Sequence, residues 1–273
     1  MDKTKRACIM IPLYQEKISA YEQISMDQCF RILGNYDIYF VIPEKLEPFI
    51  RTNPYILSGQ AAYRTFNNNF FTDIPAYNRL LKYPGLYQTF LDYDYLLIYQ
   101  LDAFVFADQL QEWCDRGYDN IGAPLFAGYE EATAASPIVG QGNGGFCLRH
   151  IKSCYEVVTS LRKLKFVKTY TDTNRSILRN AYRYLKHQQL FIYSLYPFQP
   201  LINEDRFWAE EIPAVFPKFK VPEPAVSVGF SFEVNPKVLF ELNNQTLPFG
   251  CHAWWRYDLA FWKTHIQSYG YEL

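Results

Sequence analysis

The apolar positions of this chain form short runs of strand length, separated by segments whose apolar residues recur at helical spacing. The longest run covers residues 95–106, and only Gln100 and Asp102 interrupt it. A nearly continuous run of this kind predicts a buried central strand that is covered by helices on both faces. Residues 7–12 and 37–43 predict two further strands. Because a helix is predicted between these two, the opening predicts a parallel pair with a right-handed crossover.

The helix between the first two strands is expected to begin at the capping box of Ser25 and Gln28 and to end near Leu33. Further along, residues 64–66 predict a third strand. Helical periodicity then covers residues 74–90, and a Pro-Gly pair interrupts it midway. We therefore expect an α/β fold with a mostly parallel central sheet flanked by helices.

Composition narrows the classes of protein. The 273 residues carry 27 Lys and Arg against 28 Asp and Glu, a net charge of -1, which gives no argument for a nucleic-acid partner. No apolar stretch reaches transmembrane length, and the first one is too short for the core of a signal peptide. We therefore expect a cytoplasmic protein. The six cysteines are scattered without a Cys-x-x-Cys pair, which indicates buried reduced thiols rather than a zinc ribbon.

A basic region follows the middle of the chain. Between residues 150 and 189, nine Lys and Arg are opposed only by Glu156 and Asp172, and the pattern is helical. A basic helical region can contact an anionic membrane surface or a polyanionic substrate. The alternative is an ordinary helix face exposed to solvent.

Asp102 is the first candidate for chemistry. Burying an isolated carboxylate is costly, so this side chain needs a partner or a cation. Open α/β sheets bind ligands beyond the carboxyl ends of their strands, which is where this residue is expected. The alternative is a carboxylate that caps a turn or the next helix. Asn78 and Arg79 lie in the predicted helix before this strand, where Arg79 can meet a phosphate or simply lie at the surface.

A glycine-rich stretch, residues 140–145, holds four of the 13 glycines of the chain and surrounds Asn143. Glycines this close together allow the backbone to approach a ligand, or supply positive φ angles. The spacing matches neither a Walker loop nor a dinucleotide-binding fingerprint. A tight turn is the alternative for any single one of these glycines.

Two later segments add titratable groups. Asn203 is a good helix N-cap before Glu204 and Asp205, and acids in a first helical turn suit the helix dipole. The functional interpretation is a general base at a helix start that faces the cleft. His252 lies among the aromatic residues 249–255. A structural hydrogen-bond donor is the common role for such a histidine, and beside a strand-end carboxylate it becomes a candidate metal ligand.

Taken in this order, these segments resemble the DUF5672 family, bacterial proteins of largely uncharacterised function with a glycosyltransferase-like, GT-A-type fold. The resemblance extends from about residue 9 to about residue 255. The matching segments are residues 99–106, 121–124, 142–149, 203–205 and 249–254. The resemblance implies one Rossmann-type nucleotide-diphospho-sugar transferase domain over residues 1–273. Residues 1–125 would form the nucleotide-binding half and residues 126–273 the acceptor-side half, with a basic helical insertion at about 150–190.

The resemblance also implies roles for single residues. GT-A enzymes commonly use an Asp-x-Asp motif to bind a divalent cation, and here Gln100 replaces its first acid. Asp102 and His252 would hold Mn²⁺ or Mg²⁺, and Glu204 or Asp205 would be the base. The expected donor- and substrate-binding residues are Pro12, Asn78, Arg79, Gln100, Asn143, Gly144, Gly145 and Trp254.

The expected function is therefore transfer of a sugar from a nucleotide-diphosphate donor to a saccharide or lipid-linked saccharide acceptor. The reaction is expected to be inverting and metal-assisted, in cell-surface polysaccharide synthesis at the inner face of the membrane. The first alternative is a catalytically inactive sugar- or nucleotide-binding protein on the same fold, which the loss of the first acid at Gln100 supports. A metal-dependent phosphoesterase or nucleotidyltransferase would need more clustered carboxylates, or a glycine loop with Lys or Arg.

Overall fold

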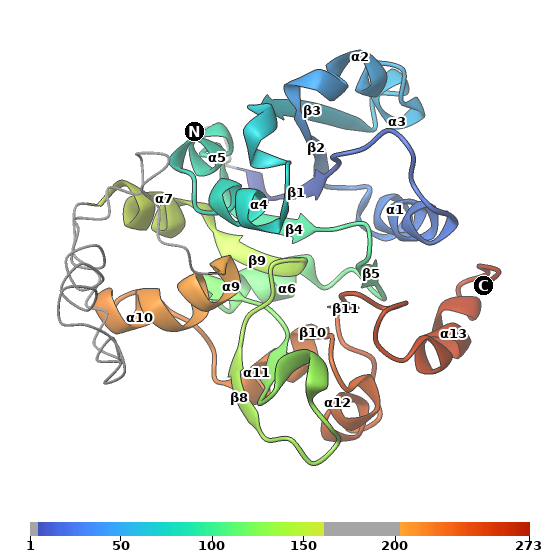
Figure 1. Ribbon diagram of the computed structural model, residues 1–273, viewed down its shortest axis with the longest axis vertical. Helices are drawn as coiled ribbons and strands as arrows, with labels where there is room; N and C mark the ends of the chain where they lie inside the picture. Colours follow the sequence, from blue (N-terminus) through green and yellow to red (C-terminus); the bar gives the residue numbers. More distant parts are fainter. Residues whose placement is uncertain (1–4, 161–202) are drawn as a thin grey trace, which may run out of the picture.

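The computed structural model describes residues 5–160 and 203–273, and its centre is a twisted sheet (Figure 1). In this described part the sheet has six strands in the order β3-β2-β1-β4-β9-β6. Strands β1 to β4 are parallel, and β9 runs antiparallel to β4 and β6. These strands are β1 (Lys5–Pro12), β2 (Asp37–Pro43), β3 (Ala61–Phe66), β4 (Tyr93–Tyr99), β6 (Asn120–Ile121) and β9 (Phe146–His150). The predicted mostly parallel central sheet is therefore confirmed.

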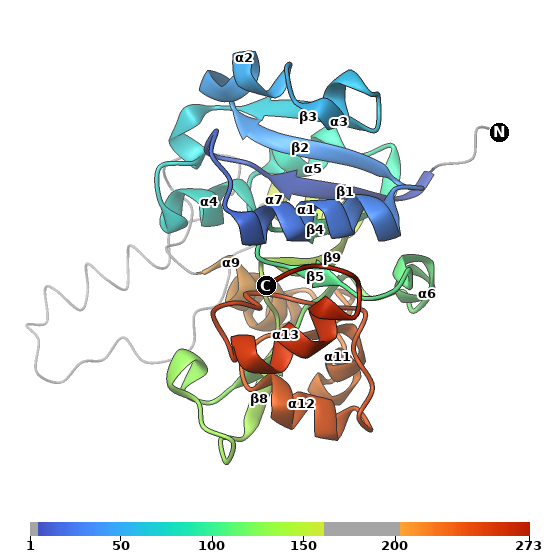
Figure 2. The same ribbon diagram turned by 90° about the vertical axis from the view of Figure 1, so that its right-hand side faces the viewer.

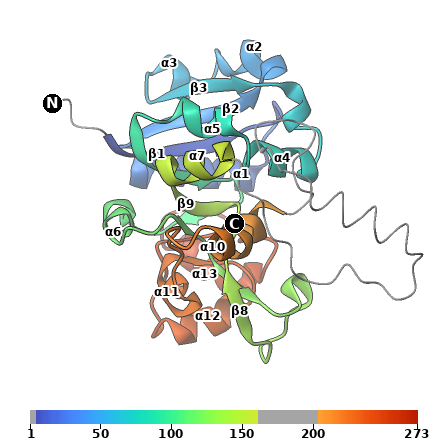
Figure 3. The ribbon, with the colours of Figure 1, turned by 90° about the vertical axis from the view of Figure 1, so that its left-hand side faces the viewer.

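The central strand β4 is buried on both faces, as predicted, but it ends at Tyr99, and the later part of the predicted run, Phe104–Val105, is the strand β5 of a second sheet. Side chains alternate along a strand, so Tyr95 and Leu97 face one side of the sheet while Leu96 and Ile98 face the other. The first pair packs with α1 (Ala20–Leu33), and the second packs with the helices that follow. These are α4 (Ile74–Leu80), α5 (Pro84–Thr89) and α7 (Ile151–Thr159). Figures 2 and 3, which view the molecule from opposite sides, show α1 on one face of the sheet and α5 and α7 on the other.

The first helix begins earlier than predicted. It starts at Ala20, and its N-cap is Ser19, which forms a capping box with Glu22. The predicted box at Ser25 is wrong, because this residue lies inside the helix and is buried. Its hydroxyl accepts a hydrogen bond of 3.0 Å from the indole N–H of Trp254. A residue type that favours caps is used here for a contact between distant segments.

The segment 74–90 is two helices, α4 and α5, because Pro84 opens the second one, as the Pro-Gly pair predicted. Only α7 of the predicted basic helical region lies in the described chain, and the rest of that region, with the predicted insertion, lies outside it. All six cysteines are buried and free, as expected. No helix of the described residues is long and apolar enough to cross a membrane.

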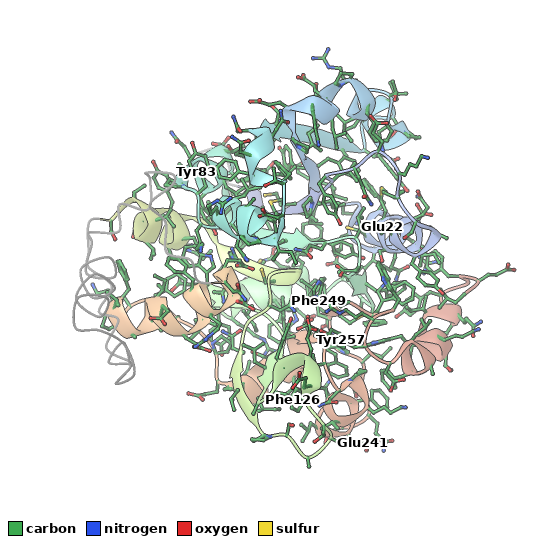
Figure 4. All side chains as sticks on the ribbon, in the orientation of Figure 1. Glu22, Tyr83, Phe126, Glu241, Phe249 and Tyr257 are labelled. Atoms are coloured by element: carbon green, nitrogen blue, oxygen red, sulfur yellow. The ribbon has the colours of Figure 1, made fainter. Side chains whose placement is uncertain are left out.

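A second layer lies below the main sheet and is formed mainly by the C-terminal part of the chain (Figure 2). Its small sheet has the order β10-β11-β5, from β5 (Phe104–Val105), β10 (Ser231–Phe232) and β11 (Gly250–Cys251). The fully buried Phe249, near the centre of the molecule in Figure 4, precedes β11. Because β11 pairs antiparallel with β5, the residue after β11 lies near the residues before β5. This pairing brings His252 to Asp102.

Shorter elements complete the described chain. Its other strands are β7 (Pro124–Phe126) and β8 (Ile138–Gln141), which pair with each other. Its other helices are α2 (Glu47–Ile50), α3 (Pro54–Leu57), α6 (Leu110–Asp115), α9 (Glu204–Arg206), α10 (Ile212–Val215), α11 (Pro224–Phe230), α12 (Pro236–Leu242) and α13 (Leu259–Gln267). Single turns of 3₁₀ helix cover Glu44–Leu46, Asn68–Phe70 and Tyr129–Glu131, and a π-helical turn covers Phe207–Glu211.

Candidate functional site

A cleft of about 710 Å³ opens at the carboxyl ends of β1 and β4. Because β9 is antiparallel to β4, the residues before β9 reach the same edge of the sheet. The helix α9 and the segment after β11 complete the walls. The residues that line the cleft include Pro12, Tyr14, Asn78, Gln100, Asp102, Tyr129, Glu130, Asn143, Gly144, Gly145, Glu204, Asp205, His252, Trp255 and Arg256.

One group of polar side chains surrounds His252, and we call it the histidine centre. It consists of Gln100, Asp102, Asn143, Glu233 and His252. The ring atom Nε2 lies 3.0 Å from Asp102 Oδ1 and 3.3 Å from Gln100 Oε1. The other ring nitrogen, Nδ1, lies 2.9 Å from Glu233 Oε1 and 3.0 Å from the amide nitrogen of Asn143. Since a carboxylate only accepts, Nδ1 donates its proton to Glu233 and the Asn143 amide packs beside the ring.

The charges of the histidine centre support one another. Burial alone would lower the pKa of His252, but the neighbouring carboxylates of Asp102 and Glu233 raise it to about 10. Burial would raise the pKa of Asp102, but the positive charge of the neighbouring His252 lowers it instead. Tyr129 adds a hydrogen bond of 3.3 Å from its hydroxyl to Glu233 Oε1.

The histidine centre fits a divalent cation through two of its atoms. Asp102 Oδ1 is buried and accepts no hydrogen bond in the described chain, yet it lies 3.0 Å from His252 Nε2. Two ligand atoms at right angles, each about 2.1 Å from a Mg²⁺ ion, would be about 3.0 Å apart. Glu233 on the opposite ring nitrogen is the usual partner that orients a ligating imidazole.

The protein supplies only part of a coordination shell. Within residues 5–160 and 203–273, no group of three or more His, Cys, Asp or Glu side chains can hold a metal ion by itself. Mg²⁺ in proteins commonly binds one or two side chains and takes its other ligands from water and substrate phosphates. Asp102 and His252 therefore fit such a cation when a diphosphate is bound beside them.

The second group lies on α9 and on β9, and we call it the arginine centre. It consists of Asn78, Arg149, Glu204 and Asp205. Arg149 forms a buried ion pair with Glu204 Oε2, and their side chains are 1% and 4% exposed. The backbone N–H of Glu204 donates to Asn78 Oδ1 at 3.2 Å. Asn203 precedes α9 as predicted, but its side chain makes no cap hydrogen bond.

Asp205 differs from its neighbour Glu204. It is half-buried, and its carboxylate accepts a hydrogen bond of 2.6 Å from the backbone N–H of Arg206. Burial, and next the negative charge of Glu204, raise the pKa of Asp205 to about 6. A carboxyl group with a pKa close to neutrality, on the wall of a cleft, can take up and release a proton under working conditions.

Two consecutive glycines separate the two centres. A Cβ atom on Gly145 would overlap His252 Nε2, and one on Gly144 would overlap Glu204 Oε1. Neither glycine has a positive φ angle, so close approach rather than backbone conformation requires glycine here. The glycine-rich stretch thus lets one functional side chain of each centre reach the backbone.

Ten of the twelve site residues expected from the sequence line this one cleft. The two others do not line it. Arg79 lies on α4 outside the lining, and Trp254 is fully buried, with its ring 5.0 Å from that of Tyr21. Trp254 is therefore a core residue, which corrects its expected contact with substrate. Its neighbour Trp255 is the aromatic side chain that reaches the cleft.

The sequence reasoning missed Arg149 and Glu233. Each is a charged residue inside an apolar run, Arg149 in Phe146–His150 and Glu233 in residues 230–234. Both are 1% exposed. A single charge in a buried strand, as at Arg149, or directly after one, as at Glu233, was the signal available, because such a charge requires a partner.

Solved structures with a similar fold of the whole chain include three transferases. Mouse xyloside xylosyltransferase 1 in its apo form shares 12% identity, over 90% of this chain and 97% of that one, with a TM-score of 0.48. A glycosyltransferase involved in glycosylation of the major capsid of PBCV-1 shares 13%, over 96% and 99%, with a TM-score of 0.47. Galactosyltransferase LgtC, in complex with donor and acceptor sugar analogs, shares 14%, over 90% and 86%, with a TM-score of 0.47.

The sequence itself is the basis for the family. No curated protein matches the chain. A family described as a protein of unknown function (DUF5672) matches residues 60–252, which is more than half of the sequence and includes both centres of the cleft. The chain therefore belongs to the DUF5672 family.

Proposed function

We propose that this protein is a GT-A-type glycosyltransferase that moves a sugar from a nucleotide-diphosphate donor to a saccharide acceptor. One observation carries the proposal. A centre suited to a cation and a diphosphate, and a carboxyl group whose pKa is raised to about 6, share one cleft at the carboxyl edge of the sheet. Ligands of open α/β sheets bind at this edge.

The charge of the cleft supports a metal-assisted reaction. Among the described residues that line it, only His252 and Arg256 are basic, and Arg256 forms an ion pair of 2.6 Å with Glu130. Six carboxylates line the same cleft: Glu22, Asp73, Asp102, Glu130, Glu204 and Asp205. A diphosphate would be repelled there unless a cation accompanied it. Mn²⁺ or Mg²⁺ held by Asp102 and His252 would neutralise the leaving diphosphate as a Lewis acid.

A carboxylate of the protein, that of Asp205, can receive the proton of the acceptor hydroxyl group. The acceptor hydroxyl oxygen forms a bond to the anomeric carbon of the sugar while the bond from that carbon to the diphosphate oxygen breaks. The diphosphate leaves with the electron pair, and Asp205 receives the hydroxyl proton. Attack opposite the leaving group inverts the anomeric configuration. General base catalysis of this kind contributes roughly 10²–10⁴-fold to a rate.

The wider role follows from the family resemblance and from the sequence. The basic stretch of residues 150–189 suits an acceptor at an anionic membrane surface, such as a lipid-linked saccharide. Synthesis of cell-surface polysaccharide at the inner face of the membrane is the setting we propose.

A second candidate is a binding protein without turnover. Two observations favour it: Gln100 replaces the first acid of the usual metal motif, and the neighbouring carboxylates raise the pKa of His252 to about 10. A protonated imidazole cannot ligate a metal. In that case Asp102, His252 and Glu233 would form a purely structural ion-pair chain.

Thermal unfolding against a panel of nucleotide sugars, with and without Mn²⁺, distinguishes the two candidates. A ligand at 100 times its Kd stabilises a protein by about 2.7 kcal/mol, which raises the melting temperature by roughly 5–10 °C in a chain of this size. We expect such a shift for one nucleotide class, only with Mn²⁺, and its loss in Asp102→Asn. Glu130→Gln is the matched control, because it removes one carboxylate charge from the same cleft.

Other outcomes would contradict the proposal. A shift that is independent of Mn²⁺ and survives Asp102→Asn argues against the metal site. Binding with no transfer to any saccharide, unchanged in Asp205→Asn, supports the binding protein. Where transfer is found, the anomeric configuration of the product, measured by NMR, tests inversion.

A further inference from the structure

Arg149 is a charged residue in the middle of β9, where it is 1% exposed. Besides its ion pair with Glu204, its Nη1 donates to the hydroxyl of Tyr87 at 3.0 Å and to the carbonyl of Leu81 at 3.3 Å. Its guanidinium also lies 5.5 Å from the ring of Trp208. A buried cation is costly, and these contacts compensate it only while Glu204 stays beside it.

The carbonyl of Leu81 fixes this arrangement from behind. It accepts a hydrogen bond of 2.6 Å from the Tyr87 hydroxyl and one of 3.2 Å from the indole N–H of Trp208, besides the one from Arg149. Leu81, Tyr87 and Trp208 are all fully buried. The guanidinium therefore has little freedom to move, and neither does the carboxylate that it holds.

The two oxygens of Glu204 have different surroundings. Oε2 pairs with Arg149, while Oε1 lies where a Cβ atom of Gly144 would be. Both Gly144 and Glu204 line the cleft. The buried side of the carboxylate is thus occupied by the protein, and the other side is next to the space for substrate.

The location of Glu204 indicates which part of a substrate it meets. Gly145, the residue after Gly144, is in contact with His252 of the histidine centre. Because the two side chains contact consecutive residues, whose Cα atoms are about 3.8 Å apart, the two centres are suited to neighbouring groups of one bound nucleotide sugar. If the diphosphate lies at the histidine centre, the sugar attached to it lies at Glu204.

Glu204 is the counterion of the buried guanidinium of Arg149, so the ion pair holds its carboxylate in place. Asp205 is half-buried, and the contact described for its carboxylate is the backbone N–H of Arg206. The two adjacent carboxylates are therefore suited to different tasks, one to a fixed hydrogen bond and the other to proton transfer.

We propose that Arg149 is a positioning residue that fixes Glu204, so that Glu204 Oε1 accepts a hydrogen bond from a hydroxyl group of the donor sugar. Asp205 remains the residue that receives the acceptor's proton. This inference rests on the proposed function, because it requires a nucleotide sugar in the cleft.

The test compares two ligands in one protein. Melting temperatures are measured with Mn²⁺ and either a nucleotide sugar of the class that stabilises the wild type or the matching nucleoside diphosphate. We expect the nucleotide sugar to bind the wild type more tightly by about 10- to 100-fold, the range for a hydrogen bond to a charged acceptor. In Arg149→Met/Glu204→Gln, which removes both buried charges together, this sugar-dependent gain is lost while the diphosphate still binds.

The matched control is Arg206→Met/Glu210→Gln, which removes an exposed ion pair next to the same helix, whose side chains are 60% and 43% exposed. This control variant should still bind the nucleotide sugar more tightly than the nucleoside diphosphate, by the same factor as the wild type. Arg149→Lys, which keeps the charge but not the fork of donors, should recover part of the sugar-dependent gain. In turnover, the double variant at positions 149 and 204 should raise the KM of the nucleotide sugar by about the same 10- to 100-fold. Its activity should still fall toward acid pH because Asp205 is intact, but at a lower pH than in the wild type, because the charge of Glu204 no longer raises the pKa of Asp205.

Three results would decide against the inference. A folded Arg149→Met/Glu204→Gln variant that keeps the full sugar-dependent gain shows that the ion pair is only structural. A wild type that binds the diphosphate and the nucleotide sugar equally overturns the contact with the sugar. A wild type that binds neither ligand contradicts the proposed function, and the inference falls with it.

Discussion

The histidine centre and the arginine centre face one cleft, yet they are buried to different degrees. In the histidine centre the side chain of Asp102 is 31% exposed and that of His252 is 13% exposed. In the arginine centre the side chains of Arg149 and Glu204 are 1% and 4% exposed. The first centre is open on the side of the cleft, whereas the ion pair of the second is enclosed by packed side chains, although Glu204 and Asp205 still line the cleft.

The difference in burial determines which partners each centre can exchange. An open group can exchange one partner for another, so Asp102 and His252 can release each other to hold a cation. A closed ion pair cannot be separated without leaving a buried charge, which costs about 3–5 kcal/mol. Asp205 is the exception within the arginine centre, because it is half-buried and its carboxylate accepts a backbone N–H. The following predictions test whether the two centres act separately.

Asp205→Asn should have the largest effect on activity. Loss of the base should lower kcat by roughly 10²–10⁴-fold, while Mn²⁺-dependent binding of the nucleotide stays unchanged because the histidine centre is intact. Steady-state kinetics with the identified donor measure kcat, and thermal shifts measure the Mn²⁺-dependent binding of the nucleotide. If nucleotide binding falls together with kcat, the two centres are not separate.

Asp205→Asn should also change the free energy of unfolding, and the direction of this change follows from the pKa of Asp205. Burial and the charge of Glu204 raise the pKa of Asp205 from 3.8 to about 6, so the folded protein binds this proton more tightly than the unfolded chain. The stabilisation from that proton is complete below pH 3.8 and is lost as the pH rises through about 6. At pH 7.5 we expect Asp205→Asn to be more stable than the wild type by about 1–2 kcal/mol, with no gain near pH 4. Urea unfolding at both pH values measures the difference.

The two glycines allow each centre to be disturbed by one methyl group. Gly145→Ala displaces His252, and Gly144→Ala displaces Glu204. A displacement of about 1 Å in an active site can cost around 100-fold in rate, so we expect both variants to lose activity to this extent. Only Gly145→Ala should lose the Mn²⁺-dependent binding of the nucleoside diphosphate. Equal loss of this binding in both variants would show that the centres form a single unit.

The sequence predicted the open centre better than the closed one. Asp102 and His252 were expected together because a strand-end carboxylate and a histidine among aromatics are local signals. The antiparallel pairing of β11 with β5 then joined them as expected. Arg149 was not predicted, because its partner Glu204 is 55 residues away and only the three-dimensional packing brings them together.

The error at the first helix has a similar cause. Ser25 fits a capping box by its local sequence, but tertiary packing uses its hydroxyl for Trp254. The same contact explains why Trp254 is buried rather than at the cleft, since its indole N–H is satisfied inside the core. The hydrophobic pattern predicted the parallel strands β1, β2 and β4 well, because they are mostly buried and apolar, whereas the antiparallel strand β9 was not predicted. Contacts between distant polar side chains leave no periodic signal.

The smallest effect is expected for a residue that acts on the histidine centre from outside. Glu233 Oε1 contacts His252 Nδ1 at 2.9 Å and should orient the imidazole toward the cleft. Loss of such an outer partner commonly weakens metal binding by about 10–100-fold, and for Glu233→Gln, which keeps an oxygen at this position, we expect about tenfold. Mn²⁺ titration in the presence of the nucleoside diphosphate measures this loss of metal affinity.

Tyr129→Phe is the matched control, because it removes only the hydroxyl that lies 3.3 Å from Glu233 Oε1. The contact of Glu233 with His252 is unchanged, and the lost hydrogen bond of 3.3 Å acts on His252 only through Glu233, so Mn²⁺ affinity should fall by no more than about threefold, the low end of the range for one hydrogen bond. If both variants weaken Mn²⁺ binding equally, the segment Tyr129–Glu131 helps to hold the histidine centre. If neither does, Glu233 only neutralises charge, and the open centre depends on Asp102 and His252 alone.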